Sequence, residues 1–194
     1  MAWNKGFYFC PTVTFEWLEE YKDGLIVLSG CLGSEVARHF IAGNLKVAED
    51  VVLQYHRVFN DDYYLELIRN GFDDKLEKDY TRFLIEIGKI YGIKVVATND
   101  VHRSNKSDNE ALKCLYKTNI GKLTNTITFP SDDWLKSEVE ILDRFSDCHE
   151  ALKSTAEIVD KIETYSIPKW NIPAKEWSEK DYQANLQRYL DITR

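Results

Sequence analysis

The sequence lacks both a long apolar run and a basic segment followed by an apolar one at its start. Nowhere in its 194 residues is there an uncharged stretch of the roughly 18 residues that a membrane-spanning helix needs. Residues 1–6 do not have the pattern of a secretory signal peptide. The sequence therefore predicts no membrane partner, and we expect a cytoplasmic protein.

The chain has too few cysteines for a disulfide-stabilised protein and too few basic residues for a protein that binds free duplex DNA. The 4 cysteines include no Cys-x-x-Cys pair, which argues against a disulfide framework and fits a reducing compartment. Lys and Arg number 25 against 32 Asp and Glu, for a net charge of −7. Such a chain lacks the general positive surface that free duplex DNA requires. Neither a Walker loop nor a dinucleotide-binding glycine pattern is present.

The composition and the apolar patterns predict a globular α/β fold. Hydrophobic residues make up 44% of the chain, which is close to the globular average. Short apolar runs predict strands at residues 25–28, 63–68 and 94–98. Apolar stripes at helical spacing predict helices over residues 45–59 and 76–91. Alternation of strands with helices favours a parallel sheet.

From about residue 131 the strand patterns stop and the chain is predicted to be mostly helical. Residues 131–150 contain seven acidic side chains against two basic ones, which indicates a solvated helical face or, alternatively, a protein-docking surface. Prolines at 168 and 173 interrupt the helical pattern, so we place a boundary near Ile167 and a short helix over residues 178–190. Three capping boxes are predicted, which pair Ser107 with Glu110, Ser137 with Glu140, and Asp147 with Glu150.

Polar side chains follow the predicted strands at their carboxyl ends, where parallel strands share one edge. Asp100 and His102 come after strand 94–98 with the spacing that puts them on one side. Cys31 follows strand 25–28 in a turn between two glycines. A carboxylate and an imidazole suit a divalent ion such as zinc, manganese or iron, and together with a thiolate they are plausible zinc ligands. The alternatives are turn chemistry for Asp100 and His102 and a small buried apolar role for Cys31.

Two more residues are weaker candidates at this edge. Glu66 lies between apolar neighbours in strand 63–68, so it must either point to solvent or meet a partner, and a salt bridge, for example with Arg69, is favoured over a metal role. Ser29 precedes a glycine but lacks the Gly-x-Ser-x-Gly pattern of a nucleophile elbow. We therefore expect metal ligands at Cys31, Asp100 and His102, with Glu66 less favoured.

Residues 24–35, 61–67 and 96–102 together resemble the bacterial replicative DNA polymerase III alpha subunit, within its PHP (polymerase and histidinol phosphatase) domain. The stretches 134–137 and 145–147 resemble the helical tail of that domain. The resemblance implies a seven-stranded (β/α) barrel whose edge binds up to three metal ions, and the matching positions are Cys31, Asp100 and His102.

The resemblance also implies which part of the family this chain represents. The His-x-His motif of the family's first strand is absent from the sequence, and Asn70 stands where many relatives carry a histidine. We therefore expect residues 1–166 to be the carboxyl-terminal half of a PHP-type (β/α)7 barrel with its helical tail. Residues 167–194 would be a linker and the start of the polymerase region.

This assignment carries expectations about function. The whole subunit would be a DNA-directed DNA polymerase whose partners are DNA, the proofreading exonuclease subunit and other replisome proteins. The chain alone is expected to be inactive, to hold zinc or manganese at an incomplete site, and to self-associate through its exposed strand edges. The alternatives are a metal-dependent phosphoesterase or exonuclease of the PHP superfamily and a non-catalytic interaction module.

Overall fold

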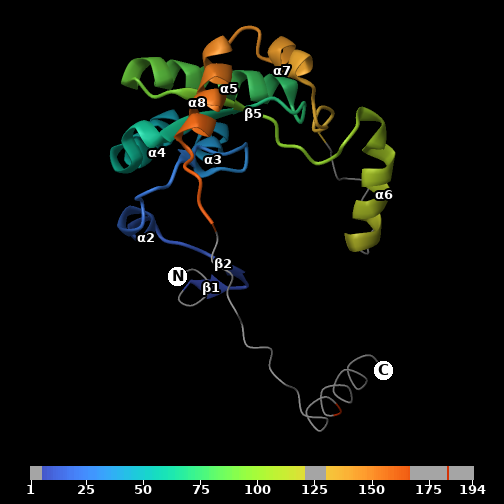
Figure 1. Cartoon of the computed structure of the whole chain (residues 1–194), viewed down its shortest axis with the longest axis horizontal. Coiled ribbons are helices and arrows are strands. Elements are labelled where there is room, and N and C mark those ends of the chain that lie inside the picture. The colour runs from blue at the N-terminus through green and yellow to red at the C-terminus, as the bar shows by residue number, and fades with distance from the viewer. Residues whose placement is uncertain (1–5, 121–129, 167–182, 184–194) are drawn as a thin grey trace. The chain divides into compact units, whose positions relative to one another are not determined.

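The computed structural model describes residues 6–120, 130–166 and 183 (Figure 1). The chain divides into two compact units, Met1–Ile162 and Glu163–Arg194. All elements discussed here belong to the first unit. The boundary predicted near Ile167 and, apart from Gln183, the helix predicted over residues 178–190 lie outside the described residues.

A three-stranded parallel sheet forms the centre of the first unit. Its order is β3 (Val27–Leu28), β4 (Tyr63–Ile68) and β5 (Val95–Thr98), and both neighbouring pairs run parallel. The α/β prediction is confirmed, and the predicted strands form close to their expected bounds. The first strand is shorter than predicted because the Leu25 amide donates to the Lys22 carbonyl in a turn. Within the described residues the sheet does not close into a barrel.

Helices connect and flank these strands (Figure 1). The two long predicted helices are confirmed as α4 and α5, and Gly92 ends α5 in the left-handed conformation with φ of 71°. None of the described helices is long and apolar enough to cross a membrane. The helical elements are α2 (Phe15–Glu20), α3 (Glu35–Ile41), α4 (Leu45–Phe59), η1 (Asn60–Asp62), α5 (Asp74–Tyr91), η2 (Lys106–Asp108), α6 (Asn109–Ile120), α7 (Glu138–Arg144) and α8 (His149–Lys161). A two-stranded hairpin of β1 (Phe7–Tyr8) and β2 (Cys10–Pro11), like α2, was not predicted.

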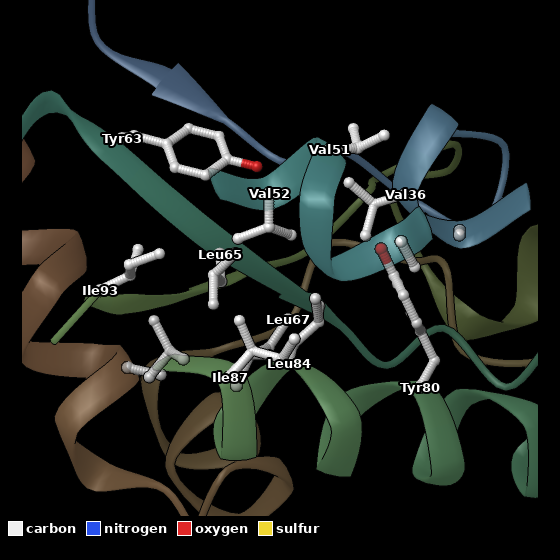
Figure 2. Close-up of a cluster of buried hydrophobic side chains, with 14 of the residues drawn as sticks. Val36, Val51, Val52, Tyr63, Leu65, Leu67, Tyr80, Leu84, Ile87 and Ile93 are labelled. Carbon is white, nitrogen blue, oxygen red and sulfur yellow. The ribbon is translucent and has the colours of Figure 1, made fainter. Parts of the chain in front are cut away.

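The hydrophobic core lies between one face of the sheet and the helices (Figure 2). Because side chains alternate along a strand, Tyr63, Leu65 and Leu67 of β4 point to the same face, and all three are buried. They belong to one apolar cluster with Leu84 and Ile87 of α5. The stripes predicted from helical spacing are thus the core faces of α4 and α5.

The two edges of the sheet differ. Helix α8 packs along β5, and the Thr155 hydroxyl donates to the Ala97 carbonyl at 2.9 Å. At the other edge, no strand within the described residues pairs with the outer side of β3. One edge of the sheet is therefore covered by a helix and the other is left without a strand partner.

Of the three predicted capping boxes, one is confirmed and two are wrong. The box at Ser137 forms as predicted and starts α7. The box predicted at Ser107 and Glu110 is displaced, because Asn105 and Asp108 form a reciprocal box at the start of η2. The Asp108 carboxylate accepts from the Asn105 amide at 2.9 Å.

The cap predicted at Asp147 and Glu150 is also wrong. Helix α8 begins after Cys148, which makes no side-chain capping bond. The Asp147 carboxylate instead accepts two hydrogen bonds from Arg69, at 2.6 and 3.0 Å. Arg69 thereby holds the pKa of Asp147 below its usual range.

The acidic stretch 131–150 is not a uniformly solvated face. Asp133 is only 1% exposed, so the interpretation as a solvated surface is wrong at this residue. Three carboxylates of the stretch pair with arginines, namely Asp132 with Arg144, Asp133 with Arg103 and Asp147 with Arg69. Much of the negative charge that suggested a docking surface is therefore neutralised within the fold.

Candidate functional site

The carboxyl ends of the three strands, which we call the rim, surround a pocket of about 380 Å³. Cys31, Glu66 and Asp100 line this pocket, each contributed by a different strand or by the turn that follows it. Parallel strands bring their carboxyl ends to one side of a sheet, so residues far apart in the chain meet here. His102 is not among the residues that line the pocket.

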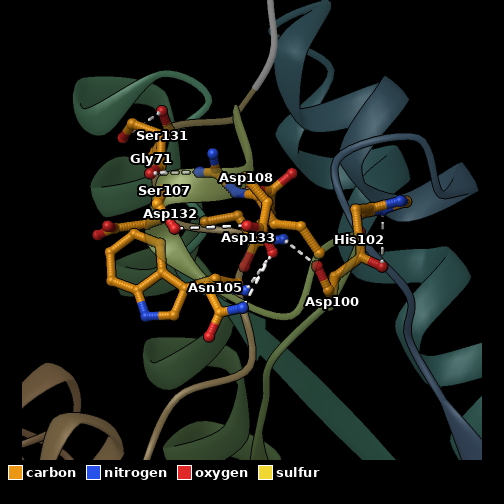
Figure 3. A network of polar contacts seen from close by, with 12 residues as sticks. Gly71, Asp100, His102, Asn105, Ser107, Asp108, Ser131, Asp132 and Asp133 are labelled. Atoms are coloured by element: carbon orange, nitrogen blue, oxygen red, sulfur yellow. Dashed lines mark hydrogen bonds and ion pairs between the residues drawn. The ribbon is translucent and has the colours of Figure 1, made fainter. Parts of the chain in front are cut away.

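Asp100 and His102 lie next to each other in the loop after β5 (Figure 3). Nε2 of His102 is 3.2 Å from Oδ1 of Asp100, and both side chains are about half exposed. The predicted placement of these two residues on one side is confirmed. A carboxylate beside an imidazole nitrogen at the surface is an arrangement that a divalent ion can bridge.

Glu66 is held by the neighbouring strand rather than by an arginine. Its carboxylate accepts from the Thr98 hydroxyl at 2.6 Å, while Arg69 pairs with Asp147. The predicted alternative of a Glu66–Arg69 salt bridge is therefore wrong. Glu66 keeps a place in the pocket, with one carboxylate oxygen committed to Thr98.

Cys31 sits in a tight turn that leads from β3 into α3. Gly30 adopts φ of 81°, a left-handed conformation that a residue with a Cβ atom adopts only under strain. The Cys31 thiol is exposed, and its sulfur accepts from the Gly33 amide at 3.4 Å. The structure thus places Cys31 at the surface, and its predicted alternative as a buried apolar residue is wrong.

Ser29 has a structural role at this edge. Its amide donates to the Tyr64 carbonyl at 2.9 Å, and its hydroxyl accepts from the Glu66 amide at 2.9 Å. Both bonds extend the pairing of β3 with β4 beyond the two-residue strand. They fix the start of the turn that carries Cys31.

Asn70 is a rim residue whose contacts sequence patterns did not indicate. It is 4% exposed and lines the pocket. Its side-chain amide donates to the Asp100 carbonyl at 3.0 Å, whereas its buried Oδ1 has no hydrogen-bond partner. Asn70 therefore ties the end of β4 to the loop that carries Asp100.

Tyr80 closes the apolar side of the pocket from helix α5. Its ring packs against Phe40 with centroids 5.2 Å apart. Burial raises the pKa of the Tyr80 phenol to about 12, so this group stays neutral at physiological pH. The pocket thus combines carboxylates and a thiol on one side with an aromatic and aliphatic wall on the other.

Cys31, Glu66 and Asp100 line the pocket and His102 lies beside Asp100, but these four candidate ligands do not converge on one point. Among the described residues no group of three or more His, Cys, Asp and Glu side chains is close enough to hold a metal ion. Asp100 and His102 alone are in contact with each other. The residues in this arrangement do not make a complete metal site, and metal binding at Cys31, Asp100, His102 and Glu66 stays a prediction.

Comparison with known proteins gives the family context of this pocket. Residues 1–70 match the PHP domain family. The chain is 28% identical to DNA polymerase III subunit alpha of Borreliella burgdorferi over 100% of its length, and 32% identical to that of Escherichia coli K12 over 89%. The resemblance to DNA polymerase III alpha is confirmed. A similar match of 30% identity over 89% of the chain links it to the Aquifex aeolicus protein.

The match covers only part of each DNA polymerase III alpha relative. The chain spans 18% of the length of the Borreliella burgdorferi protein, 15% of the Escherichia coli protein and 16% of the Aquifex aeolicus protein. The similarity to the Borreliella burgdorferi protein extends over both the parallel sheet and the helical stretch after residue 131.

Proposed function

We propose that this chain is a part of the PHP region of a replicative DNA polymerase III alpha subunit and works in DNA replication. The observation that supports it is similarity over 82–100% of the chain to that subunit in several bacteria. In this proposal the three strands are the second half of a PHP-type (β/α)7 barrel. The whole subunit would act on DNA with a proofreading exonuclease and other replisome proteins, in the cytoplasm.

In this role the chain acts as a scaffold rather than as an enzyme of its own. Metal-dependent phosphodiester cleavage with two ions needs them about 3.5–4 Å apart and firmly held. The described rim offers one close pair of candidate ligands, Asp100 and His102, and one carboxylate oxygen of Glu66 is taken by Thr98. We infer that the chain alone neither extends a primer nor degrades DNA.

The metal proposal is limited to the residues that face the rim. Cys31, Asp100 and His102 would contribute ligands to zinc or manganese, with Glu66 less favoured, and further ligands would come from the other half of the barrel. A bound ion would supply Lewis-acid stabilisation of negative charge.

The test assays the purified 194-residue chain for primer extension and for nuclease activity with added Mn²⁺ or Zn²⁺. The expected result is no activity above that of the Asp100→Ala variant prepared in the same way. Nuclease activity that disappears in Asp100→Ala would overturn the proposed inactivity. It would favour the alternative of a PHP-superfamily phosphoesterase or exonuclease.

Two further measurements separate the remaining alternatives. Sequencing the source DNA on both sides of this coding region is expected to reveal an in-frame His-x-His motif upstream and a polymerase palm downstream. Stop codons on both sides would contradict the proposal. Metal analysis of the purified chain then distinguishes a phosphoesterase, which holds metal tightly, from a non-catalytic interaction module, which holds none.

A further inference from the structure

The loop that carries Asp100 and His102, residues 99–103, has little regular structure of its own. Only Arg103 takes part in a β-bridge, with Trp134. Asp100 and His102 are both exposed, so their own packing does not fix them. Their relative position must depend on what holds the loop backbone.

The backbone of this loop is held by residues 131–136, which come about thirty positions later in the chain. The His102 amide donates to the Asp133 carbonyl at 2.8 Å, and the Leu135 amide donates to the Arg103 carbonyl at 3.0 Å. Arg103 and Trp134 pair as a parallel β-bridge. Segment 131–136 therefore runs beside the loop and pairs with it at one β-bridge (Figure 3).

Side chains reinforce this pairing. Nε of Arg103 lies 2.6 Å from Oδ1 of Asp133, and the two side chains are only 3% and 1% exposed. The Arg103 guanidinium also donates to the Ser131 carbonyl at 2.8 Å. Asn99 donates to the Trp134 carbonyl at 2.8 Å. Separating the two segments would leave either charge unpaired in the interior, which is strongly unfavourable.

Asn70 connects the same segment to the pocket. Its carbonyl accepts from the Asp132 amide at 2.7 Å, and its side chain donates to the Asp100 carbonyl at 3.0 Å. The ion pair of Arg103 with Asp133 thus lies at one end of a set of contacts whose other end is the backbone of Asp100.

Three cationic side chains pack around the ring of Trp134 in the same segment. Arg103, Lys106 and Lys136 lie 5.7, 5.0 and 4.3 Å from its ring centroid. Trp134 is 8% exposed, so its ring is occupied by these contacts and is not open for stacking on a ligand.

We propose that Asp133 is a positioning residue for the rim, which holds His102 beside Asp100 through segment 131–136. The inference rests on the proposed function only in one respect, which is that the Asp100–His102 pair would contribute metal ligands. The positioning itself is a property of the fold. Asp133 does not line the pocket, and it acts through the backbone of the loop.

The test compares Asp133→Asn, in the full chain, with a control at a second arginine-paired carboxylate, Asp147, which is 64% exposed. Asp147→Asn also removes a carboxylate that lies 2.6 Å from an arginine, but Asp147 makes no contact with residues 99–103. Asn99→Ala is a milder second variant at a half-exposed position, and it keeps the question open to measurement if Asp133→Asn does not fold.

Amide hydrogen exchange is the main readout. In Asp133→Asn the exchange of the Leu65 amide in β4 reports the loss of global stability, and the amides of His102 and Leu135 are expected to exchange at least about tenfold faster than that loss accounts for, as local opening becomes easier. Asn99→Ala is expected to shift the same two amides by a smaller factor. The His102 imidazole NMR signals are expected to move in both variants and to stay unchanged in Asp147→Asn.

A titration with Mn²⁺ forms a separate arm. If the wild-type chain binds Mn²⁺, Asp133→Asn is expected to weaken binding about tenfold, as loss of an outer support of a metal ligand does. If the wild-type chain binds no Mn²⁺, the proposed metal role fails. The hydrogen-exchange measurement then still tests whether Asp133 positions the loop. Unchanged exchange at His102 in Asp133→Asn, or an equal rise in Asp147→Asn, overturns the inference.

Discussion

Gly88 allows α5 to approach the start of β5 closely, and its replacement by alanine tests how tightly these elements pack. A Cβ atom at position 88 would lie 2.7 Å from the carbonyl oxygen of Ile93. It would also touch Leu65 and Val95, each at 3.5 Å. The first contact is with backbone, and the Ile93 amide donates to the Gly88 carbonyl at 2.9 Å. The two segments therefore cannot separate without lengthening this bond.

Two effects of opposite sign decide the outcome of Gly88→Ala. Alanine in a helix interior is favoured over glycine by about 1 kcal/mol. Forcing an extra carbon into a packed interior costs typically about 1–3 kcal/mol, and the upper part of that range applies because backbone has to move. We expect the free energy of unfolding to fall by about 1–2 kcal/mol.

Urea unfolding followed by circular dichroism measures this change, with Lys89 as the control position. Lys89 is the next residue of α5 and is exposed, so Lys89→Ala is expected to be more stable than Lys89→Gly by the helix preference alone, about 1 kcal/mol. The same alanine–glycine comparison should have the opposite sign at position 88. A Gly88→Ala protein more stable than the wild type would refute the packing argument.

Four further outcomes are expected. Removing only one partner of the buried Arg103–Asp133 pair should lower the free energy of unfolding by about 3–5 kcal/mol, and replacing both with apolar residues should cost less than the sum of the single changes in a double-mutant cycle. Burial raises the pKa of the Tyr80 phenol to about 12 from about 10 in an unfolded chain. The stabilisation that comes from this neutral phenol is complete below pH 10 and is lost as the pH rises towards 12. In Tyr80→Phe the free energy of unfolding should therefore fall less steeply as the pH rises from 10 to 12. Arg69 lowers the pKa of Asp147, so its stabilisation is present above about pH 4 and lost as the pH falls further; Asp147→Asn should change stability at neutral pH by less than about 1 kcal/mol, because this carboxylate is exposed. In sedimentation at micromolar concentration the chain should self-associate through the unpaired side of the sheet, and a monomer at every concentration would contradict this.

The predictable parts of the fold are those set by local periodicity. The strand over residues 63–68 and the helices over 45–59 and 76–91 follow from the spacing of apolar residues. This spacing can be read from the sequence without knowing which elements pack against each other. The closeness of Asp100 and His102 could also be predicted, because one short loop after one strand carries both.

The rest depends on contacts between distant segments. Asp147 has the pattern of a helix cap, but a guanidinium makes a stronger, charge-assisted bond to it than a backbone amide does, and only the fold brings Arg69 within reach. Asp133 stands in an acidic stretch that looks solvated, and nothing near it in sequence indicates Arg103. The Glu66–Thr98 bond required the register of β4 with β5, which periodicity alone does not provide.

The two edges of the sheet differ in how readily a further strand can pair with them. At β5, the Ala97 carbonyl is already occupied by Thr155 of α8, so a strand arriving on that side would have to displace the helix. At β3, the backbone of Val27 and Leu28 can accept a neighbour with no such competition from the described residues. Any additional strands, whether from the same polypeptide or from a second molecule, are therefore expected to add first at β3, and closing the proposed barrel on the β5 side would require α8 to leave the Ala97 carbonyl.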